Sequence, residues 1–201
     1  MKRTDKLVTI RRYEDRLVKF GKSVKTMGWR DREQQWLRFK ILTEIADLRS
    51  KKILDVGCGF GDLYTFLREK KIKVDYSGYD ISPMIISEAK KIRPPLHFEI
   101  KDILVNPVKR RFDYAFSSGV FNHRISNNLE FTRSMIKKMF EISRRGVAVN
   151  MMTDYVDYKE SHLFYYSPEN IFRLAKSLTR HVVLRHDYPL YEFTLYLYRT
   201  L

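Results

Sequence analysis

Three glycines and an aspartate carry the first chemical signal of this sequence. The stretch ILDVGCGFG places Gly57, Gly59 and Gly61 at alternate positions directly after Asp55. Glycines allow a bound molecule to approach the backbone closely, and a carboxylate beside them suits a cationic amine better than a phosphate. The spacing G-x-G-x-G is one residue shorter than the G-x-G-x-x-G of nicotinamide dinucleotide sites, and no Gly-Lys-Ser/Thr of a P-loop follows.

Two further aspartates follow later apolar runs. Asp80 ends the run SGYD, where a carboxylate is placed to accept hydrogen bonds from both hydroxyls of a ribose. Asp102 follows the next run and is placed to accept a hydrogen bond from an adenine amino group, with Ile103 against the ring. Three acids at three successive strand ends suit an adenosine that carries a cationic tail rather than a pyrophosphate.

Strands and helices must alternate to bring these acids together. After Lys52, short apolar runs alternate with amphipathic ones, which predicts a parallel sheet covered by helices on both faces. The predicted strands are Ile53–Val56, Val74–Tyr79, Leu96–Ile100, Phe112–Ser117, Gly146–Met151, His181–His186 and Glu192–Arg199. The predicted helices are Gly61–Glu69, Pro83–Ile92, Asn128–Ile142 and Pro168–Leu178. The linker between the last two strands is too short for a helical crossover, so we expect them to form an antiparallel hairpin.

Residues 1–50 are predicted to form a helical extension or lid on the sheet domain of residues 51–201, within one compact domain. Apolar residues recur at helical spacing up to Gly21, and Asp31–Leu48 is predicted to be a second amphipathic helix. We expect the apolar faces of both helices to be buried. Trp29 and Arg30, between the helices, are predicted to close over the cleft.

Composition limits the range of functions. The formal net charge is +15, but the basic residues are scattered, which favours a solvated basic surface over a dedicated nucleic-acid groove. No apolar run approaches a membrane span, no secretory signal core opens the sequence, and there is one cysteine, Cys58. We therefore expect a cytoplasmic protein without a membrane partner or a disulfide framework; the sequence does not indicate its oligomeric state.

At these positions the sequence resembles the class I, Rossmann-like S-adenosylmethionine-dependent methyltransferases. Asp55–Gly61 resembles their first motif, Gly78–Ser82 their second and Phe112–Gly119 their fourth, and Asp102 matches their adenine-binding acid. The resemblance implies an α/β three-layer sandwich whose mostly parallel seven-stranded sheet ends in an antiparallel strand. It also implies S-adenosyl-L-methionine as the cofactor and S-adenosyl-L-homocysteine as the product. The implied cofactor-binding residues are Asp55, Gly57, Cys58, Gly59, Gly61, Asp80, Ile81, Asp102, Ile103, Ser117 and Ser118.

Candidate residues for the methyl acceptor come from loops that follow later strands and from the N-terminal segment. His123 is the preferred candidate for a general base, and His186 beside Asp187 is a second candidate. The substrate-binding candidates are Trp29, Arg30, Asn122, Tyr155 and Tyr166. No metal-ligand spacing stands out, so no metal is expected.

The class of acceptor is less sharply indicated. Ser117-Ser118-Gly119-Val120 stands where methyltransferases of nucleic-acid amino groups carry Asn/Asp-Pro-Pro-Tyr/Phe. The segment resembles small-molecule methyltransferases, including sequences loosely labelled trans-aconitate methyltransferase-like. The leading interpretation is methyl transfer to an O or N atom of a small molecule. The alternatives are an RNA-directed methyltransferase that uses the basic surface, and a cofactor-binding regulatory protein without turnover.

Overall fold

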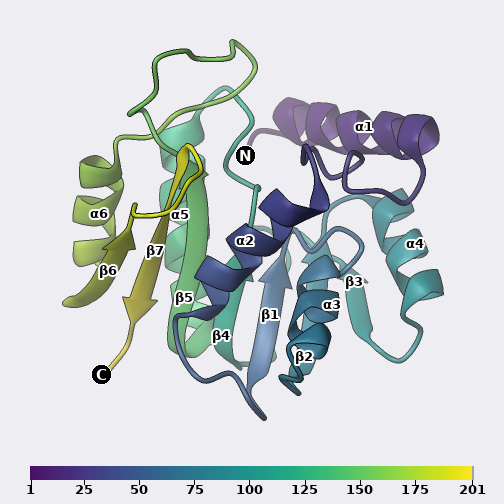
Figure 1. Ribbon diagram of the computed structural model, residues 1–201, viewed down its shortest axis with the longest axis horizontal. Coiled ribbons are helices and arrows are strands. Elements are labelled where there is room, and N and C mark those ends of the chain that lie inside the picture. Colours follow the sequence, from purple (N-terminus) through teal and green to yellow (C-terminus); the bar gives the residue numbers. More distant parts are fainter. Residues whose placement is uncertain (201) are drawn as a thin grey trace.

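The computed structural model describes residues 1–200, which form a seven-stranded sheet flanked by helices (Figure 1). The strands are β1 (Lys52–Val56), β2 (Asp75–Asp80), β3 (His97–Ile100), β4 (Phe112–Ser117), β5 (Ser143–Met152), β6 (His181–Arg185) and β7 (Glu192–Tyr198). Their order is β3-β2-β1-β4-β5-β7-β6, with β1 to β5 mutually parallel. Strand β7 runs antiparallel to both β5 and β6. This confirms the prediction of a mostly parallel sheet that ends in an antiparallel hairpin.

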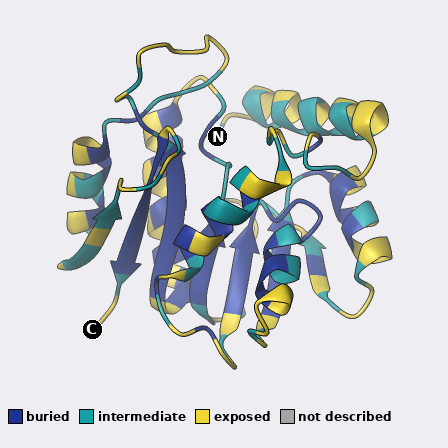
Figure 2. Ribbon diagram, in the orientation of Figure 1, coloured by how far each residue is buried: buried dark blue, intermediate teal, exposed yellow. Residues whose placement is uncertain are grey.

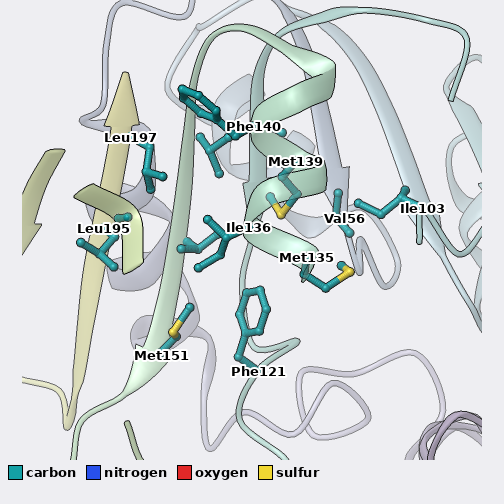
Figure 3. Close-up of a cluster of buried hydrophobic side chains, with 14 of the residues drawn as sticks. Val56, Ile103, Phe121, Met135, Ile136, Met139, Phe140, Met151, Leu195 and Leu197 are labelled. Carbon is teal, nitrogen blue, oxygen red and sulfur yellow. The ribbon is translucent and has the colours of Figure 1, made fainter. Parts of the chain in front are cut away.

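Helices cover both faces of the sheet, and one helix, α1 (Arg3–Phe20), lies at its edge (Figure 1). The helices on the two faces are α2 (Arg32–Thr43), α3 (Asp62–Glu69), α4 (Pro83–Ile92), α5 (Asn128–Ile142) and α6 (Pro168–Lys176). Ile53 of β1 packs in a core cluster with side chains from α2, α3 and α4, whereas its neighbour Leu54 packs on the opposite face with α5 and α6. Figure 3 shows part of the second cluster, between α5 and the strands. The three-layer prediction is therefore confirmed. None of the helices within residues 1–200 has the length and hydropathy to cross a bilayer.

Local sequence signals begin the helices that border the carboxyl ends of the strands. The side chain of Asp31 accepts a hydrogen bond from Gln34 N at 2.8 Å and caps α2. Ser82 caps α4 by accepting from Ile85 N at 3.2 Å, and a proline follows it at the first helical position. These caps fix where the chain leaves the loops that border the site.

Helix α1 contradicts the expectation that its apolar face is buried. None of its residues is buried (Figure 2), and Leu7, Val8 and Val18 are exposed. The reason is its position: α1 lies across the carboxyl edge of the parallel strands instead of on a sheet face (Figure 1). The second predicted helix also ends earlier than expected, at Thr43, although Leu48 beyond it is buried.

Candidate active site

A pocket lies at the carboxyl ends of β1 and β2 and extends to the loop after β4. Its wall includes the glycine turn from Gly57 to Gly59 and the three aspartates at the ends of β1, β2 and β3. Open α/β sheets bind ligands at this edge because the strands end there and the helices begin. The topology thus brings together residues that are far apart in the sequence.

The glycine turn has a shape that only glycine adopts without strain. Gly57 has φ +73° and Gly59 has φ +54°. A Cβ atom on Gly57 would overlap the side chain of Val120, and one on Gly59 would overlap the thioether of Met27. The amide of Gly57 donates to Tyr79 O at 2.7 Å, which fastens the turn to the end of β2. Side chains at these positions would fill the space that a ligand needs.

Asp80 holds the turn from the neighbouring strand. One carboxylate oxygen accepts from Gly59 N at 3.1 Å and the other from Ser82 N at 3.0 Å. Desolvation raises the pKa of Asp80, while these backbone hydrogen bonds oppose the shift. A carboxylate accepts up to about four hydrogen bonds, so its remaining lone pairs are available to ribose hydroxyls.

Asp55 lies buried at the end of β1 and lines the pocket. Its carboxylate accepts a hydrogen bond from the Tyr76 hydroxyl at 2.7 Å. Burial raises the pKa of Asp55 to about 7, and the hydrogen bond from Tyr76 partly offsets that shift. A cationic group in the pocket would stabilise the ionised form.

Asp102 is paired with the N-terminal helix. Its Oδ2 accepts from Lys6 Nζ at 3.0 Å, and its Oδ1 accepts from Leu104 N at 3.1 Å. Ile103, the next residue, is buried and lines the pocket with Ile81. Asp102 therefore keeps acceptor capacity toward an adenine amino group while it fastens α1 over the pocket.

The remaining candidate residues for the cofactor lie at different depths. Ser118 lines the pocket, whereas Ser117 is buried behind it and donates to Val56 O at 3.0 Å. Gly61 caps the start of α3 and does not line the pocket. Cys58 lines the pocket and is buried, and burial holds the pKa of its thiol well above the usual value, which argues against a nucleophilic role.

The pocket has unsatisfied polar atoms that fit an adenosyl group with a charged tail. The buried Gln35 donates its amide N–H to Asp62 at 3.2 Å, but its Oε1 has no partner. The Ser118 hydroxyl also lacks a partner, and both residues line the pocket. Buried polar atoms are normally hydrogen-bonded, so these atoms are suited to a polar ligand.

His123 lines the pocket beside α1. The Arg12 guanidinium donates to its Nδ1. Arginine has only donors, so Nδ1 must be the acceptor and the proton of the neutral ring must lie on Nε2. Burial, with the positive charge of Arg12, lowers the pKa of His123 to about 4. In this arrangement His123 is a neutral hydrogen-bond donor, and a role as base requires Arg12 to move away.

His186 lies elsewhere. It borders a separate surface groove with Tyr155, whose ring centroid is 5.9 Å away. Asp187 pairs with Arg185 at 2.7 Å instead of orienting His186. The structure therefore does not bring His186 to the pocket at the strand ends.

The five substrate-binding candidates are also dispersed. Trp29 lines the pocket, whereas Arg30 points to solvent and pairs with Asp31 at 2.9 Å. Asn122 is buried and does not line the pocket; its Oδ1 is unpaired, and its backbone O accepts from Phe164 N at 2.9 Å.

Two tyrosines complete that set. Tyr166 is fully buried, and its hydroxyl donates to Phe121 O at 3.1 Å, as expected of a packing residue. Tyr155 is exposed in the surface groove, where its hydroxyl bonds to Glu169.

Several pocket residues were missed by sequence reasoning. Ile10 and Tyr13 of α1 and Met27 of the following loop form one side of the pocket, and Gln35 of α2 lies beside them. Only Gln35 had a usable signal, because it is a polar residue within the buried side of an amphipathic helix. The others depend on where α1 lies.

The strand order and the glycine turn, together with acids at three strand ends, define an α/β cofactor-binding enzyme of the methyltransferase class. A family model described as "Methyltransferase domain" matches residues 47–187, so the chain belongs to this family. It is an S-adenosylmethionine-dependent methyltransferase, and S-adenosylmethionine is its cofactor.

Similar proteins differ in what their names say they act on. A Mycobacterium tuberculosis protein named "Putative methyltransferase Rv1506c" is 35% identical over 157 residues, which are 71% of this chain and 90% of that protein. The tRNA U34 carboxymethyltransferase of Aeromonas hydrophila is 34% identical over 122 residues, 54% of this chain but only 35% of that protein. The magnesium protoporphyrin IX methyltransferase of Synechocystis, solved with bound S-adenosylhomocysteine, superposes with a TM-score of 0.64 at 15% identity, covering 83% of this chain and 82% of that one.

Proposed function

We propose that this enzyme transfers a methyl group from S-adenosylmethionine to an O or N atom of a small-molecule acceptor. The observation that carries the proposal is the roof of the pocket. Thr9, Ile10 and Tyr13 of α1 cover one side, and Met27 and Trp29 of the next loop cover another. A pocket roofed by the chain's own helix favours a small acceptor over a folded polymer. A cytoplasmic location is part of the same proposal.

The proposed division of labour follows from the pocket. The backbone of the glycine turn contacts the cofactor, while Asp80 binds the ribose and Asp102 binds the adenine amino group. Asp55 stabilises the cationic tail. The cofactor supplies a methyl group on a sulfonium, which is already activated toward displacement. Alignment of donor and acceptor then supplies most of the rate, up to roughly 7–11 kcal/mol of barrier lowering.

We further propose that residues 1–50 act as a lid on the methyltransferase domain of residues 51–201. The lid also affects His123, because the guanidinium of Arg12 in α1 donates a hydrogen bond to Nδ1 of that ring. Displacement of the Arg12 side chain would free Nδ1 to accept a proton from a hydroxyl or amine acceptor. No metal is required for such a transfer, and none is proposed.

An acceptor screen tests the proposal. The enzyme is incubated with S-adenosylmethionine labelled in the methyl group and with either a small-molecule filtrate of cell extract or the RNA of that extract. Incorporation of label into the filtrate is the expected result, with S-adenosylhomocysteine formed in equal amount. Label in RNA alone would contradict the small-molecule assignment, and S-adenosylhomocysteine binding without transfer to either fraction would support a regulatory role.

RNA is a second candidate acceptor because of the charge of the lid. Residues 1–25 contain nine lysines and arginines against three acids, and α1 lies at the rim of the pocket. A relative that covers part of this chain is named as a tRNA carboxymethyltransferase. The same screen decides between the two acceptors.

A further inference from the structure

Several buried polar atoms lack a hydrogen-bond partner, both in the cofactor pocket and beside β7. Within residues 1–200, five buried side-chain atoms lack a partner: Ser23 Oγ, Gln35 Oε1, Arg38 Nη1, Ser118 Oγ and Asn122 Oδ1. Gln35 and Ser118 line the cofactor pocket, but Arg38 does not. A buried guanidinium with an unused nitrogen is the strongest of these signals, because a donor that carries charge is the most costly to leave unpaired.

The Arg38 side chain extends from α2 into a buried polar cluster with Glu192 of β7 and Asn150 of β5. Its Nε and Nη2 donate to the same oxygen of Glu192, at 2.8 and 2.7 Å, and its side chain is only 9% exposed. The other Glu192 oxygen accepts from Asn150 Nδ2 at 2.9 Å. Both oxygens of the Glu192 carboxylate therefore accept hydrogen bonds, whereas Nη1 of Arg38 remains without an acceptor.

Trp29 lies between this cluster and the cofactor pocket. Its ring covers the Arg38 guanidinium at 4.3 Å and also lines the pocket. The far edge of the ring rests against Gly119, where a Cβ atom would lie 2.9 Å away from it. Gly119 N in turn donates to Asn150 Oδ1 at 3.2 Å. A shift of the Trp29 ring would therefore expose the Arg38 guanidinium to the pocket.

We propose that Arg38 Nη1 anchors a carboxylate of the methyl acceptor, with Trp29 as the gate between that carboxylate and the cofactor. The inference rests on the proposed small-molecule function and names its substrate class. Glu192 and Asn150, which position Arg38, belong to β7 and β5, whereas the acids assigned to the cofactor end β1, β2 and β3. Arg38 thus lies beside β5 and β7, away from the strand ends that carry the three acids.

The charges of Arg38 and Glu192 favour one kind of anion over another. Glu192 already neutralises the guanidinium in part, so a doubly charged phosphate would be repelled by the carboxylate beside it. A singly charged carboxylate can accept both N–H groups of Nη1 without a second cation. The guanidinium is also the more suitable donor group, since the compact ammonium of lysine lacks the outer nitrogen that reaches the free side.

Tryptophan fluorescence can report on this site directly. The chain has two tryptophans, so Trp36→Phe leaves Trp29 as the only reporter. This variant, saturated with S-adenosylhomocysteine, is titrated with acetate, benzoate and citrate and, as neutral matches, acetamide and benzamide. We expect a saturable change in emission with at least one carboxylate and none with the amides, because the carboxylate displaces the ring from the guanidinium.

The decisive variant is Arg38→Lys in the same background, which keeps the charge opposite Glu192 but removes Nη1. We expect carboxylate affinity to fall at least about tenfold, while S-adenosylhomocysteine affinity, measured by calorimetry, stays within a factor of about two. Arg49→Lys is the matched control, since Arg49 is an exposed arginine paired with Asp47. It should change neither affinity.

Three results would overturn the proposal. The first is a titration in which no carboxylate changes the Trp29 emission, or in which amides do so equally. The second is unchanged carboxylate affinity in Arg38→Lys. The third is loss of S-adenosylhomocysteine affinity in a folded Arg38→Lys variant, which would assign Arg38 to the cofactor. These experiments measure binding, whereas the acceptor screen measures methyl transfer. Methylation of RNA alone would contradict the small-molecule function, whatever the binding measurements show.

Discussion

At the scale of single residues, we expect Asp55 to make cofactor binding depend on pH. Its burial raises its pKa to about 7, so in the free enzyme it is largely protonated below that pH. A raised pKa means that Asp55 favours the folded state at low pH and that this contribution is lost as the pH rises through about 7. A cationic ligand reverses the preference, because it favours the ionised carboxylate.

We therefore predict that cofactor affinity rises about tenfold between roughly pH 6 and pH 8, as Asp55 ionises. Calorimetric titration of S-adenosylmethionine across this range is the measurement. The Asp55→Asn variant should bind more weakly and show a flat pH profile. An equally steep profile in Asp55→Asn would assign the pH dependence to another group.

His123 offers a second test at this scale. Its pKa of about 4 has burial as the first cause and the Arg12 charge as the second. We predict that Arg12→Met raises the pKa of His123 toward the ordinary value of about 6.5, measured by NMR titration of the histidine ring nitrogens. The wild-type ring should carry its proton on Nε2. A proton on Nδ1 in the wild type would contradict the contact with Arg12.

At the scale of elements, α1 is held by polar contacts around the rim of the pocket. Lys6 pairs with Asp102 at 3.0 Å, and Glu14 accepts from the Ser82 hydroxyl at 2.8 Å. At the other end of this region, Lys22 pairs with Glu88 at 3.0 Å. An element held by partly exposed ion pairs, with no buried side chain, is expected to open more easily than one with a buried apolar face.

This attachment predicts ligand-dependent protection of the N-terminal segment. Trypsin should cleave near Arg30 in the free enzyme, and S-adenosylhomocysteine should slow that cleavage as the lid is held closed. Cleavage is followed by mass spectrometry at equal enzyme concentration. Identical cleavage rates with and without ligand would mean that α1 and the Trp29 loop are a static cover.

The elements also show what sequence patterns can and cannot reveal. The spacing of apolar residues and the positions of chain-breaking residues predicted every strand of the sheet. Because parallel strands end at one edge, the predicted strand ends also placed Asp55, Asp80 and Asp102 together. The position of α1 could not be predicted in this way. Its apolar spacing indicated a buried face, but tertiary placement over the pocket left Leu7 and Val18 exposed. Contacts such as Lys6 with Asp102 depend on that placement.

At the scale of the whole molecule, the net charge of +15 favours weak, non-specific association with RNA. If the basic surface is only solvated, binding of labelled tRNA should be weak and should fall steeply with added salt, by a slope of about 0.7–0.9 per phosphate contact in a double-logarithmic plot. Fluorescence anisotropy at several salt concentrations measures this slope. A tight, saturable complex at physiological salt, with methyl transfer to that tRNA, would reverse the proposed ranking of acceptors.

We propose that the pocket at the ends of β1 and β2 holds the cofactor through Asp80. Calorimetric titration of S-adenosylhomocysteine into Asp80→Asn tests it, with Asp75→Asn at the opposite end of β2 as the matched control, since Asp75 pairs with Arg110 on the surface. Loss of charge-assisted hydrogen bonds worth about 1.5–3 kcal/mol predicts an affinity roughly ten- to a hundredfold lower in Asp80→Asn, with Asp75→Asn unchanged. Equal affinity in the wild type, Asp80→Asn and Asp75→Asn would contradict the proposed role of Asp80.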